Sequence, residues 1–146
     1  MDTHALPFYR LDTSVANLYV SQCIRTPVTL GDKIRKRRLE LKMLQKDVAA
    51  FIGVSEDSVT FWENNRFFPS IKHMPKIIDF LGYYPFEIDL NSLSGKLKYY
   101  RNLKGLSHFE LAKLLNVDAT TTTSWESGKV PQFLTLKRLY SILGKF

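Results

Sequence analysis

Residues 45–66 read QKDVAAFIGVSEDSVTFWENNR, and their pattern is the strongest structural signal in the chain. The apolar residues of 45–52 recur at helical spacing, which predicts a short amphipathic helix with the small Ala49 on its buried face. Gly53 follows directly, and glycine adopts a left-handed backbone conformation more easily than any other residue. Ser55 is a favourable N-cap for a second helix. The stretch therefore predicts two short helices that are joined by a tight turn and cross closely at the alanine.

The same pattern recurs 63 residues further along the chain. Rare residues align there together with the apolar positions, which chance seldom produces. The matching pairs are Arg38 and Arg101, Ala49 and Ala112, Trp62 and Trp125, and Glu63 and Glu126. At the turn Asn116 replaces Gly53, and asparagine is the next most favourable residue for a left-handed conformation. Asp118 replaces the capping Ser55, so the chain contains two copies of one module of about 52 residues.

The flanks of each stretch complete a small helical bundle. Thr29 and Asp32 have the spacing of a capping box and open a helix in the first copy. Ser92 takes the equivalent position in the second copy, where Gly105 ends the helix. The fourth helices of the two copies are expected near 75–81 and 133–143.

The predicted fold is therefore all-α, with two tandem bundles of four to five helices. Pro85 argues against a continuous helix between the bundles. The expected organisation is a partly ordered N-terminal arm over 1–27, a first domain over 28–82, a linker over 83–91 and a second domain over 92–146.

Composition narrows the class of protein. The net charge is +7 with 45% apolar residues, which is typical of a folded protein with anionic partners. Cys23 is the only cysteine, so an internal disulfide is excluded, and no metal-binding set of cysteines and histidines is recognised. We recognise neither a signal peptide nor an apolar run of the roughly 18 residues that a membrane span needs. We expect a cytoplasmic protein without cofactor, metal, membrane contact or small-molecule ligand, and no catalytic constellation points to an enzyme.

Both stretches resemble the Xre/lambda-repressor-like helix-turn-helix family. In the first copy the resemblance rests on Gln45–Ala49, Gly53–Ser55 and Trp62–Arg66. In the second it rests on His108–Ala112, Asn116–Asp118 and Trp125–Lys129. The resemblance covers about residues 28–146 and implies two tandem domains that bind double-stranded DNA. It also implies one structural ion pair in each copy, Arg38 with Glu63 and Arg101 with Glu126.

The resemblance assigns a role to the second helix of each motif, which enters the major groove of DNA with its N-terminal residues at the base edges. The residues expected to contact bases are Ser55, Glu56, Asp57 and Phe61 in the first copy, and Asp118, Ala119, Thr120 and Ser124 in the second. The residues expected to hold phosphates are Gln45, Ser58, Asn64 and Arg66, and His108, Thr121, Ser127 and Lys129. Phosphate contacts set the register on the duplex, whereas base contacts carry the sequence information.

Two features of these surfaces leave alternatives open. Glu56 and Asp57 can accept hydrogen bonds from cytosine N4, but they also lie in a first helical turn, where acids stabilise the helix dipole. The β-branched run Thr120–Thr123 weakens a helix, and Thr122 replaces the core residue Val59. We therefore expect the second copy to be the less stable one, with threonine methyl groups able to contact thymine.

Charge is unevenly distributed between the copies. Residues 28–89 contain ten Lys and Arg against nine Asp and Glu, whereas residues 90–146 contain nine against three. The second copy is therefore expected to supply more of the non-specific affinity for phosphates, and the first copy more of the selectivity. The basic residues of 33–38 fit either a solvated helix face or a contact with the DNA backbone.

We expect a sequence-specific transcription regulator of a prokaryote, bound to double-stranded DNA in the nucleoid, with a homodimer as one option. The alternative is a protein-interaction module, such as an antitoxin or a phage-type adaptor, that uses the same helical surface.

Overall fold

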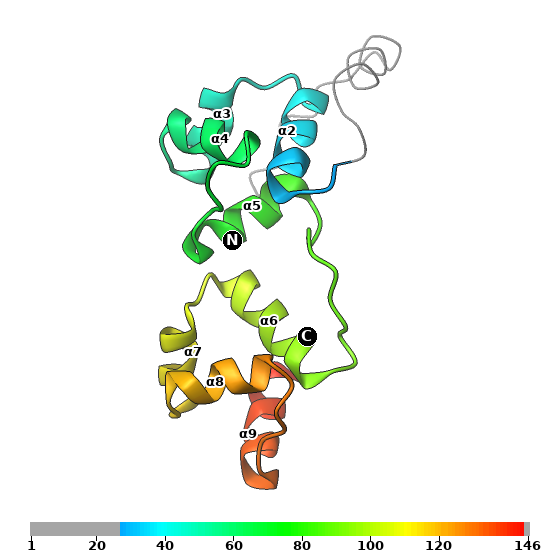
Figure 1. The fold of residues 1–146 in the computed structure, drawn as a ribbon, viewed down its shortest axis with the longest axis vertical. Helices are drawn as coiled ribbons and strands as arrows, with labels where there is room; N and C mark the ends of the chain where they lie inside the picture. Colours follow the sequence, from blue (N-terminus) through cyan, green and yellow to red (C-terminus); the bar gives the residue numbers. More distant parts are fainter. Residues whose placement is uncertain (1–26, 145–146) are drawn as a thin grey trace. The chain divides into compact units, whose positions relative to one another are not determined.

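The computed structural model describes residues 27–144, and this range is all-α, as predicted (Figure 1). It divides into two compact units between Phe68 and Pro69. Unit 1 comprises the described residues up to Phe68, and unit 2 those from Pro69 onward. The predicted N-terminal arm lies outside the described residues except for its last residue, Pro27.

The described part of unit 1 contains the helices α2 (Leu30–Glu40), α3 (Gln45–Ile52) and α4 (Glu56–Glu63). Both α2 and α3 pack against α4. Gly31 allows α2 to approach α4, because a Cβ atom there would lie 1.9 Å from the carbonyl oxygen of Trp62. The buried apolar residues are Leu30, Ile34, Val48, Ala49, Ile52, Val59 and Trp62.

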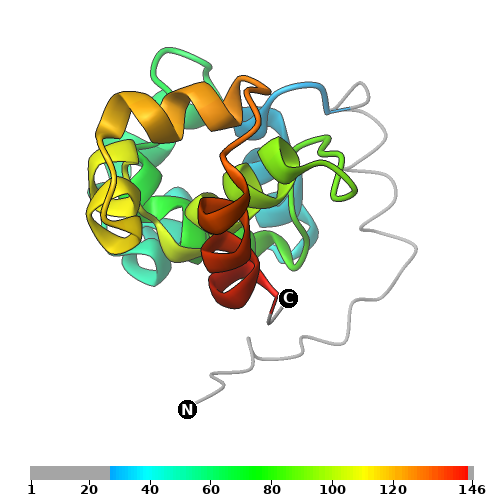
Figure 2. The same ribbon diagram turned by 90° about the horizontal axis from the view of Figure 1, so that it is seen from below.

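The described part of unit 2 begins with a 3-10 turn, Ile71–His73, which leads into α5 (Met74–Leu81). It continues with α6 (Leu93–Lys104), α7 (His108–Leu115), α8 (Ala119–Glu126) and α9 (Phe133–Leu143). α8 packs against α6 and α7, and α6 also packs against α5 and α9. Figures 1 and 2 show α9 running crosswise to α8. One buried apolar cluster of this unit consists of Leu97, Leu111, Leu115, Trp125, Leu139 and Leu143, and the apolar face of α5 is buried as well.

The backbone of α2–α4 recurs in α6–α8 at a constant offset of 63 residues between helix starts. Residues with positive φ recur at the same offset: Lys42 and Gly105, Gly53 and Asn116, and Asn65 and Gly128. The left-handed conformations predicted for Gly53 (φ 84°) and Asn116 (φ 54°) are therefore confirmed. The two aligned stretches thus share their local backbone as well as their residue pattern.

Side-chain caps fix the starts of several helices. The hydroxyl of Thr29 accepts a hydrogen bond from the Asp32 N–H, and the Asp32 carboxylate accepts one from the Thr29 N–H, each at 3.0 Å, which confirms the predicted capping box. Ser92 and Ser55 also cap their helices as predicted. Asp118 occupies the N-cap position of α8, as predicted, but its side chain accepts no capping hydrogen bond.

Aromatic and polar contacts hold the segment after α5 against α6. The ring of Tyr84 meets that of Tyr99 at a steep angle, with 4.8 Å between the centroids. Asn102 Nδ2 donates a hydrogen bond to the Tyr84 hydroxyl at 2.8 Å. Burial raises the pKa of Tyr84, although the Asn102 hydrogen bond opposes that shift. The segment that begins the predicted linker is therefore tied to unit 2.

The division of the structure falls before α5, whereas the sequence placed this helix in a first domain over 28–82. The physical reason is that α5 and the segment after it pack on α6. The predicted domain limits themselves stay predictions. The expectation of a non-helical connection around Pro85 is confirmed. Within residues 27–144, no helix is long and apolar enough to cross a membrane.

Candidate nucleic-acid interface

A buried ion pair joins α2 to the end of α4 in unit 1. Arg38 Nε donates a hydrogen bond to Glu63 Oε1 at 2.6 Å, and Arg38 Nη2 donates to Oε2 at 2.8 Å. The remaining guanidinium nitrogen donates to the carbonyl of Met43 at 3.2 Å. Only 2% of the Glu63 side chain is exposed, so the loss of either partner would leave a desolvated charge. The ion pair that the sequence predicted is thus present and structural.

Gln45, the first residue of α3, completes this cluster. Its Nε2 donates a hydrogen bond to Glu63 Oε2, and its Oε1 accepts one from the Thr60 hydroxyl, both at 2.9 Å. One N–H of the amide is therefore engaged with Glu63, and the phosphate contact expected of Gln45 stays a prediction. Sequence reasoning missed the structural role. A signal was present, because His108 and Glu126 repeat the 18-residue spacing of Gln45 and Glu63.

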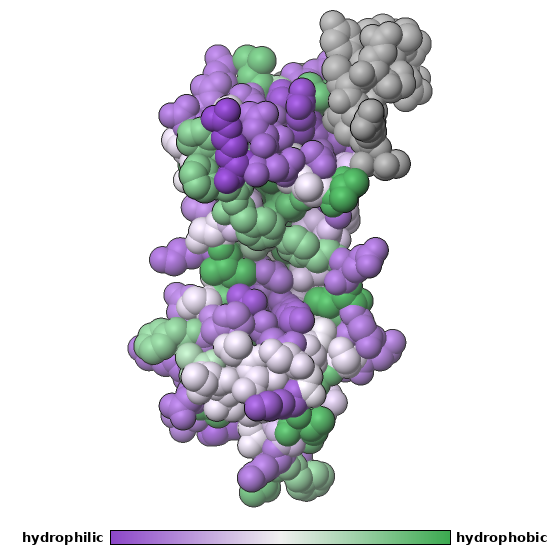
Figure 3. All heavy atoms as spheres, viewed as in Figure 1, coloured by the Kyte–Doolittle hydropathy of each residue, from purple (hydrophilic) through white to green (hydrophobic). Residues whose placement is uncertain are grey.

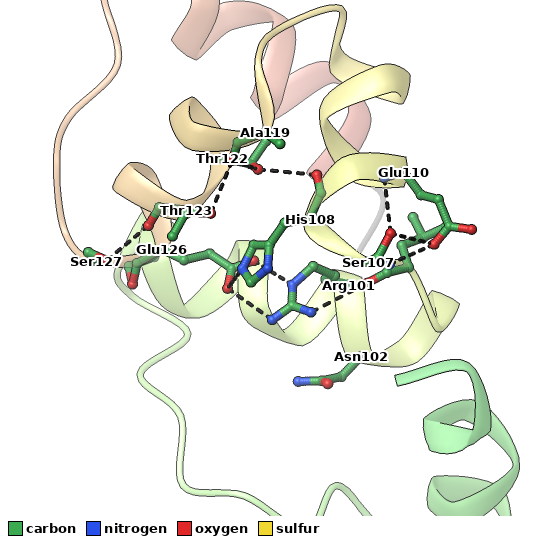
Figure 4. Close-up of polar contacts among 12 residues, drawn as sticks. Arg101, Asn102, Ser107, His108, Glu110, Ala119, Thr122, Thr123, Glu126 and Ser127 are labelled. Atoms are coloured by element: carbon green, nitrogen blue, oxygen red, sulfur yellow. Dashed lines mark hydrogen bonds and ion pairs between the residues drawn. The ribbon is translucent and has the colours of Figure 1, made fainter. Parts of the chain in front are cut away.

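Unit 2 contains the same cluster with a histidine in place of the glutamine (Figure 4). Arg101 Nε donates to Glu126 Oε1 at 2.7 Å, and Arg101 Nη2 donates to Oε2 at 3.1 Å. The remaining guanidinium nitrogen donates to the carbonyl of Leu106 at 3.4 Å. His108 Nε2 lies 3.1 Å from Glu126 Oε2, and 39% of the histidine side chain is exposed. The cluster therefore fixes α6, α7 and α8 as its counterpart fixes α2, α3 and α4.

The first turn of α4 presents the residues that the sequence assigned to base contacts. Ser55 Oγ accepts a hydrogen bond from the Ser58 N–H at 3.3 Å, and the two hydroxyl oxygens lie 2.9 Å apart. Both serines are thus engaged at the helix start. Glu56 and Asp57 are exposed, so their carboxylates face solvent or a partner.

The rest of the predicted unit 1 surface lies at the far end of α4. Phe61 is half-buried and meets the ring of Phe67 edge-on, with 5.5 Å between centroids. Asn64 is exposed and donates a hydrogen bond from Nδ2 to the carbonyl of Thr60 at 2.8 Å. Arg66 is exposed. Phe61 is therefore in part a packing residue, whereas Arg66 presents its charge at the surface.

The equivalent surface of unit 2 has a different chemistry. Asp118 and Thr120 are exposed, and Ala119, Thr121 and Ser124 are half-buried. Ser127 Oγ donates to the carbonyl of Thr123 at 2.9 Å, and Lys129 is exposed. The structure therefore places the predicted contact residues of both copies at equivalent positions of their helices, and their roles toward DNA stay predictions.

Thr122 is fully buried at the position that Val59 occupies in unit 1, as predicted. Its hydroxyl oxygen lies 2.8 Å from the carbonyl oxygen of Ala119 and 3.2 Å from that of His108, so two acceptors share its hydrogen (Figure 4). The hydroxyl thus meets acceptors inside the core, which removes the main cost of burying it.

Two acids near these surfaces are structural. The Glu110 carboxylate accepts hydrogen bonds from the N–H and the hydroxyl of Ser107, both at 2.8 Å, and the bond from the Ser107 N–H lowers the pKa of Glu110. The N–H of Thr29 lowers the pKa of Asp32 in the same way. The Ser107–Glu110 capping box matches a Ser-x-x-Glu pattern in the sequence, which sequence reasoning missed. Among the described side chains, no group of three or more histidines, cysteines or acids is arranged to hold a metal ion.

Comparison with known proteins supports a helix-turn-helix for part of the chain. A helix-turn-helix family model, HTH_3, matches residues 34–88, which include all of α3 and α4. No curated protein and no solved structure matches the chain. The match supports the helix-turn-helix family for residues 34–88 and, with it, binding of DNA by this part of the protein.

Proposed function

We propose that the chain is a sequence-specific transcription regulator that binds double-stranded DNA through two helix-turn-helix units, α3–α4 and α7–α8. It would be a prokaryotic, cytoplasmic protein of the nucleoid and a binding protein, not an enzyme. A homodimer is not required, because two recognition helices on one chain already supply contacts to two parts of a DNA site.

One observation carries the proposal: the first turn of α4 is exposed, while a buried cluster of hydrogen-bonded side chains holds the other end of the helix in place. The cluster of Arg38, Glu63 and Gln45 fixes the end of α4 relative to α2 and α3. Glu56 and Asp57 stay exposed at the other end. A major groove about 12 Å wide admits such a helix end, so side chains there can meet base edges.

The proposal extends to unit 2 because its buried Arg–Glu cluster repeats the cluster of unit 1. The Arg101–Glu126 pair has the same atoms in contact as the pair in unit 1, and the turn between α7 and α8 has a left-handed residue, Asn116, at the position of Gly53. Lys129 is exposed at the position equivalent to Arg66. Because α8 is held by the same kind of cluster as α4 and is followed by a cation at the same position, binding to the same kind of ligand is favoured.

Selection of bound duplexes from a random library tests the proposal. We expect enriched sequences with two separable parts. Glu56→Ala should change the preference in one part and Thr120→Ala in the other, whereas Asp79→Ala and Ser141→Ala, at exposed positions of α5 and α9, should change neither. The absence of enrichment, together with no duplex affinity by fluorescence anisotropy at low salt, would contradict the proposal.

A second candidate function is a protein-interaction module, and the exposed carboxylates of Glu56 and Asp57 favour it, because they repel phosphates. In that case the chain should co-purify with a basic protein that blocks duplex binding. The double variant Glu56→Gln/Asp57→Asn should release that protein. Under the leading proposal the same variant changes base preference instead.

A further inference from the structure

The surface of α8 differs in chemistry from that of any charged recognition helix. The segment over 118–127 reads DATTTTSWES and contains no arginine, lysine, asparagine or glutamine. These four residue types make the bidentate hydrogen bonds that identify guanine and adenine in the major groove. Within α8 the one ionisable residue, Glu126, is buried and paired with Arg101. Figure 3, in the view of Figure 1, accordingly shows near-neutral colours over α8.

Several hydroxyl groups of α8 point back to the backbone of the helix. Thr123 Oγ1 donates to the carbonyl of Ala119 at 3.0 Å. The hydroxyl of Thr122 shares that carbonyl, and Ser127 Oγ donates to the carbonyl of Thr123 (Figure 4). Of these three residues only Thr123 is an exposed threonine, and because its hydroxyl is engaged with the backbone, its methyl group is the part that remains available to a base.

The first turn of α8 carries Ala119 and Thr120, at the positions that place side chains on base edges in a helix-turn-helix. Ala119 is partly exposed and offers a methyl group alone. Thr120 is exposed and offers a methyl group beside its hydroxyl. Alanine and threonine methyl groups make apolar contacts with the C5 methyl group of thymine, the one apolar group that the base edges present in the major groove.

We propose that α8 recognises thymine through the C5 methyl group, and that the part of the DNA site facing unit 2 contains A·T pairs at the contacted positions. The inference rests on the proposed function, because it specifies what the second unit recognises. The exposed carboxylate of Asp118 beside this surface can accept from cytosine N4 and would add a C·G pair next to the thymines. Unit 1 has Glu56 and Asp57 in place of Ala119 and Thr120, and these acids present no methyl group.

Replacement of thymine by uracil tests the inference, because it removes the C5 methyl group and leaves the pairing edge unchanged. Each thymine of a selected duplex is replaced in turn, and affinity is measured by fluorescence anisotropy. We expect a loss of about fourfold at one or two positions, the amount that burial of one methyl group contributes. The loss should occur only in the part of the site whose selection responds to changes in α8.

Two conservative changes of Thr120 identify the group responsible. Thr120→Ser removes the methyl group and keeps the hydroxyl, whereas Thr120→Val keeps the methyl shape and removes the hydroxyl. We expect Thr120→Val to retain the preference for thymine over uracil and Thr120→Ser to reduce it. Ser141→Ala, at an exposed position of α9, serves as the control and should leave the preference unchanged.

Three outcomes would overturn the inference. Tight duplex binding without any effect of uracil overturns it and leaves the proposed function standing. Retention of the thymine preference by Thr120→Ser with its loss in Thr120→Val assigns the recognition to the hydroxyl and overturns it as well. Absence of binding to any duplex overturns the inference together with the proposed function.

Discussion

The helices α2–α4 and α6–α8 have the same backbone conformation, but they differ in the positions that carry backbone strain and in the side chains that are exposed. At the three left-handed positions, unit 1 has Lys42, Gly53 and Asn65, whereas unit 2 has Gly105, Asn116 and Gly128. Glycine adopts these conformations without steric cost and other residues do not. Each unit therefore tolerates strain at a different place while the turn geometry is kept.

The buried ion pairs of the two units resemble each other more closely than the exposed helix starts do. The Arg–Glu pair uses the same atoms in both units. The exposed first turns instead carry Glu56 and Asp57 in one unit and Ala119 and Thr120 in the other. The comparison indicates that a few buried contacts fix the fold, and that the recognition surfaces are free to diverge.

The largest effect is expected from removal of the buried acids. Glu63→Ala and Glu126→Ala should each lower the free energy of unfolding of their unit by about 3–5 kcal/mol, because the arginine is left unpaired. The chain has two tryptophans, Trp62 and Trp125, one in each unit. Urea unfolding followed by fluorescence in Trp125→Phe and Trp62→Phe backgrounds reports the two units separately.

A control separates the ion pair from simple packing. The double variant Arg38→Met/Glu63→Leu should cost much less than Glu63→Ala, since no uncompensated charge remains. An equal cost for the double and the single variant would show that packing, not the stranded charge, dominates.

Gly31→Ala is expected to destabilise unit 1 by about 1–3 kcal/mol, toward the upper end, because its Cβ would overlap the carbonyl oxygen of Trp62. The equivalent residue of unit 2 is Ser94, whose hydroxyl donates to the carbonyl of Glu126. Ser94→Ala should cost only about 1 kcal/mol, the loss of one hydrogen bond. Thermal unfolding of both variants tests whether α2 approaches α4 more closely than α6 approaches α8. Equal losses of stability in the two variants would contradict this difference between the units.

The left-handed position after the first helix should respond in opposite directions in the two units. Gly105→Ala should destabilise unit 2 by about 1–2 kcal/mol, because φ is 66° and the new Cβ would lie 3.0 Å from Pro75 Cγ. Lys42→Gly should stabilise unit 1 by less than about 1 kcal/mol, since the relief of strain is offset by backbone entropy. Urea unfolding of the two variants checks the signs, and a destabilised Lys42→Gly would contradict the account.

The smallest effect is the pH dependence of the two capping boxes. The pKa values of Asp32 and Glu110 are lowered in the folded state, chiefly by the N–H groups of Thr29 and Ser107. Their contribution to stability is therefore complete above the ordinary carboxyl range and is lost as the pH falls through the lowered folded-state values. Asp32→Asn and Glu110→Gln should flatten the decline in melting temperature between about pH 5 and pH 3. An unchanged pH profile in both variants would contradict this.

Local features were predictable from the sequence because they depend on residues close together in the chain. The box of Thr29 and Asp32, the positive φ of Gly53 and the buried Thr122 are examples. Asp118 occupies the predicted cap position but does not bond, because position alone does not set the side-chain direction.

Contacts that depend on packing could not be predicted in the same way. The bond from Gln45 to Glu63 depends on the relative placement of α3 and α4, and the only sequence signal for it is the 18-residue spacing that recurs in His108 and Glu126. The packing of α5 on α6 was also missed, because an apolar face predicts that a helix is buried but does not identify the helix that covers it. At the candidate site, the family pattern therefore identified the Arg–Glu partners, but not the contacts that Gln45 and His108 add to them.

The most direct test of the account is the salt dependence of duplex binding in variants of the equivalent cations Arg66 and Lys129. If both units bind DNA, Arg66→Ala and Lys129→Ala should each reduce the slope of log affinity against log salt by about 0.9, and the double variant should reduce it by about 1.8. Arg138→Ala, at an exposed position of α9, should leave the slope unchanged. A slope that responds to Arg66→Ala but not to Lys129→Ala would contradict binding by two units, and a slope that responds to neither would contradict binding through these surfaces.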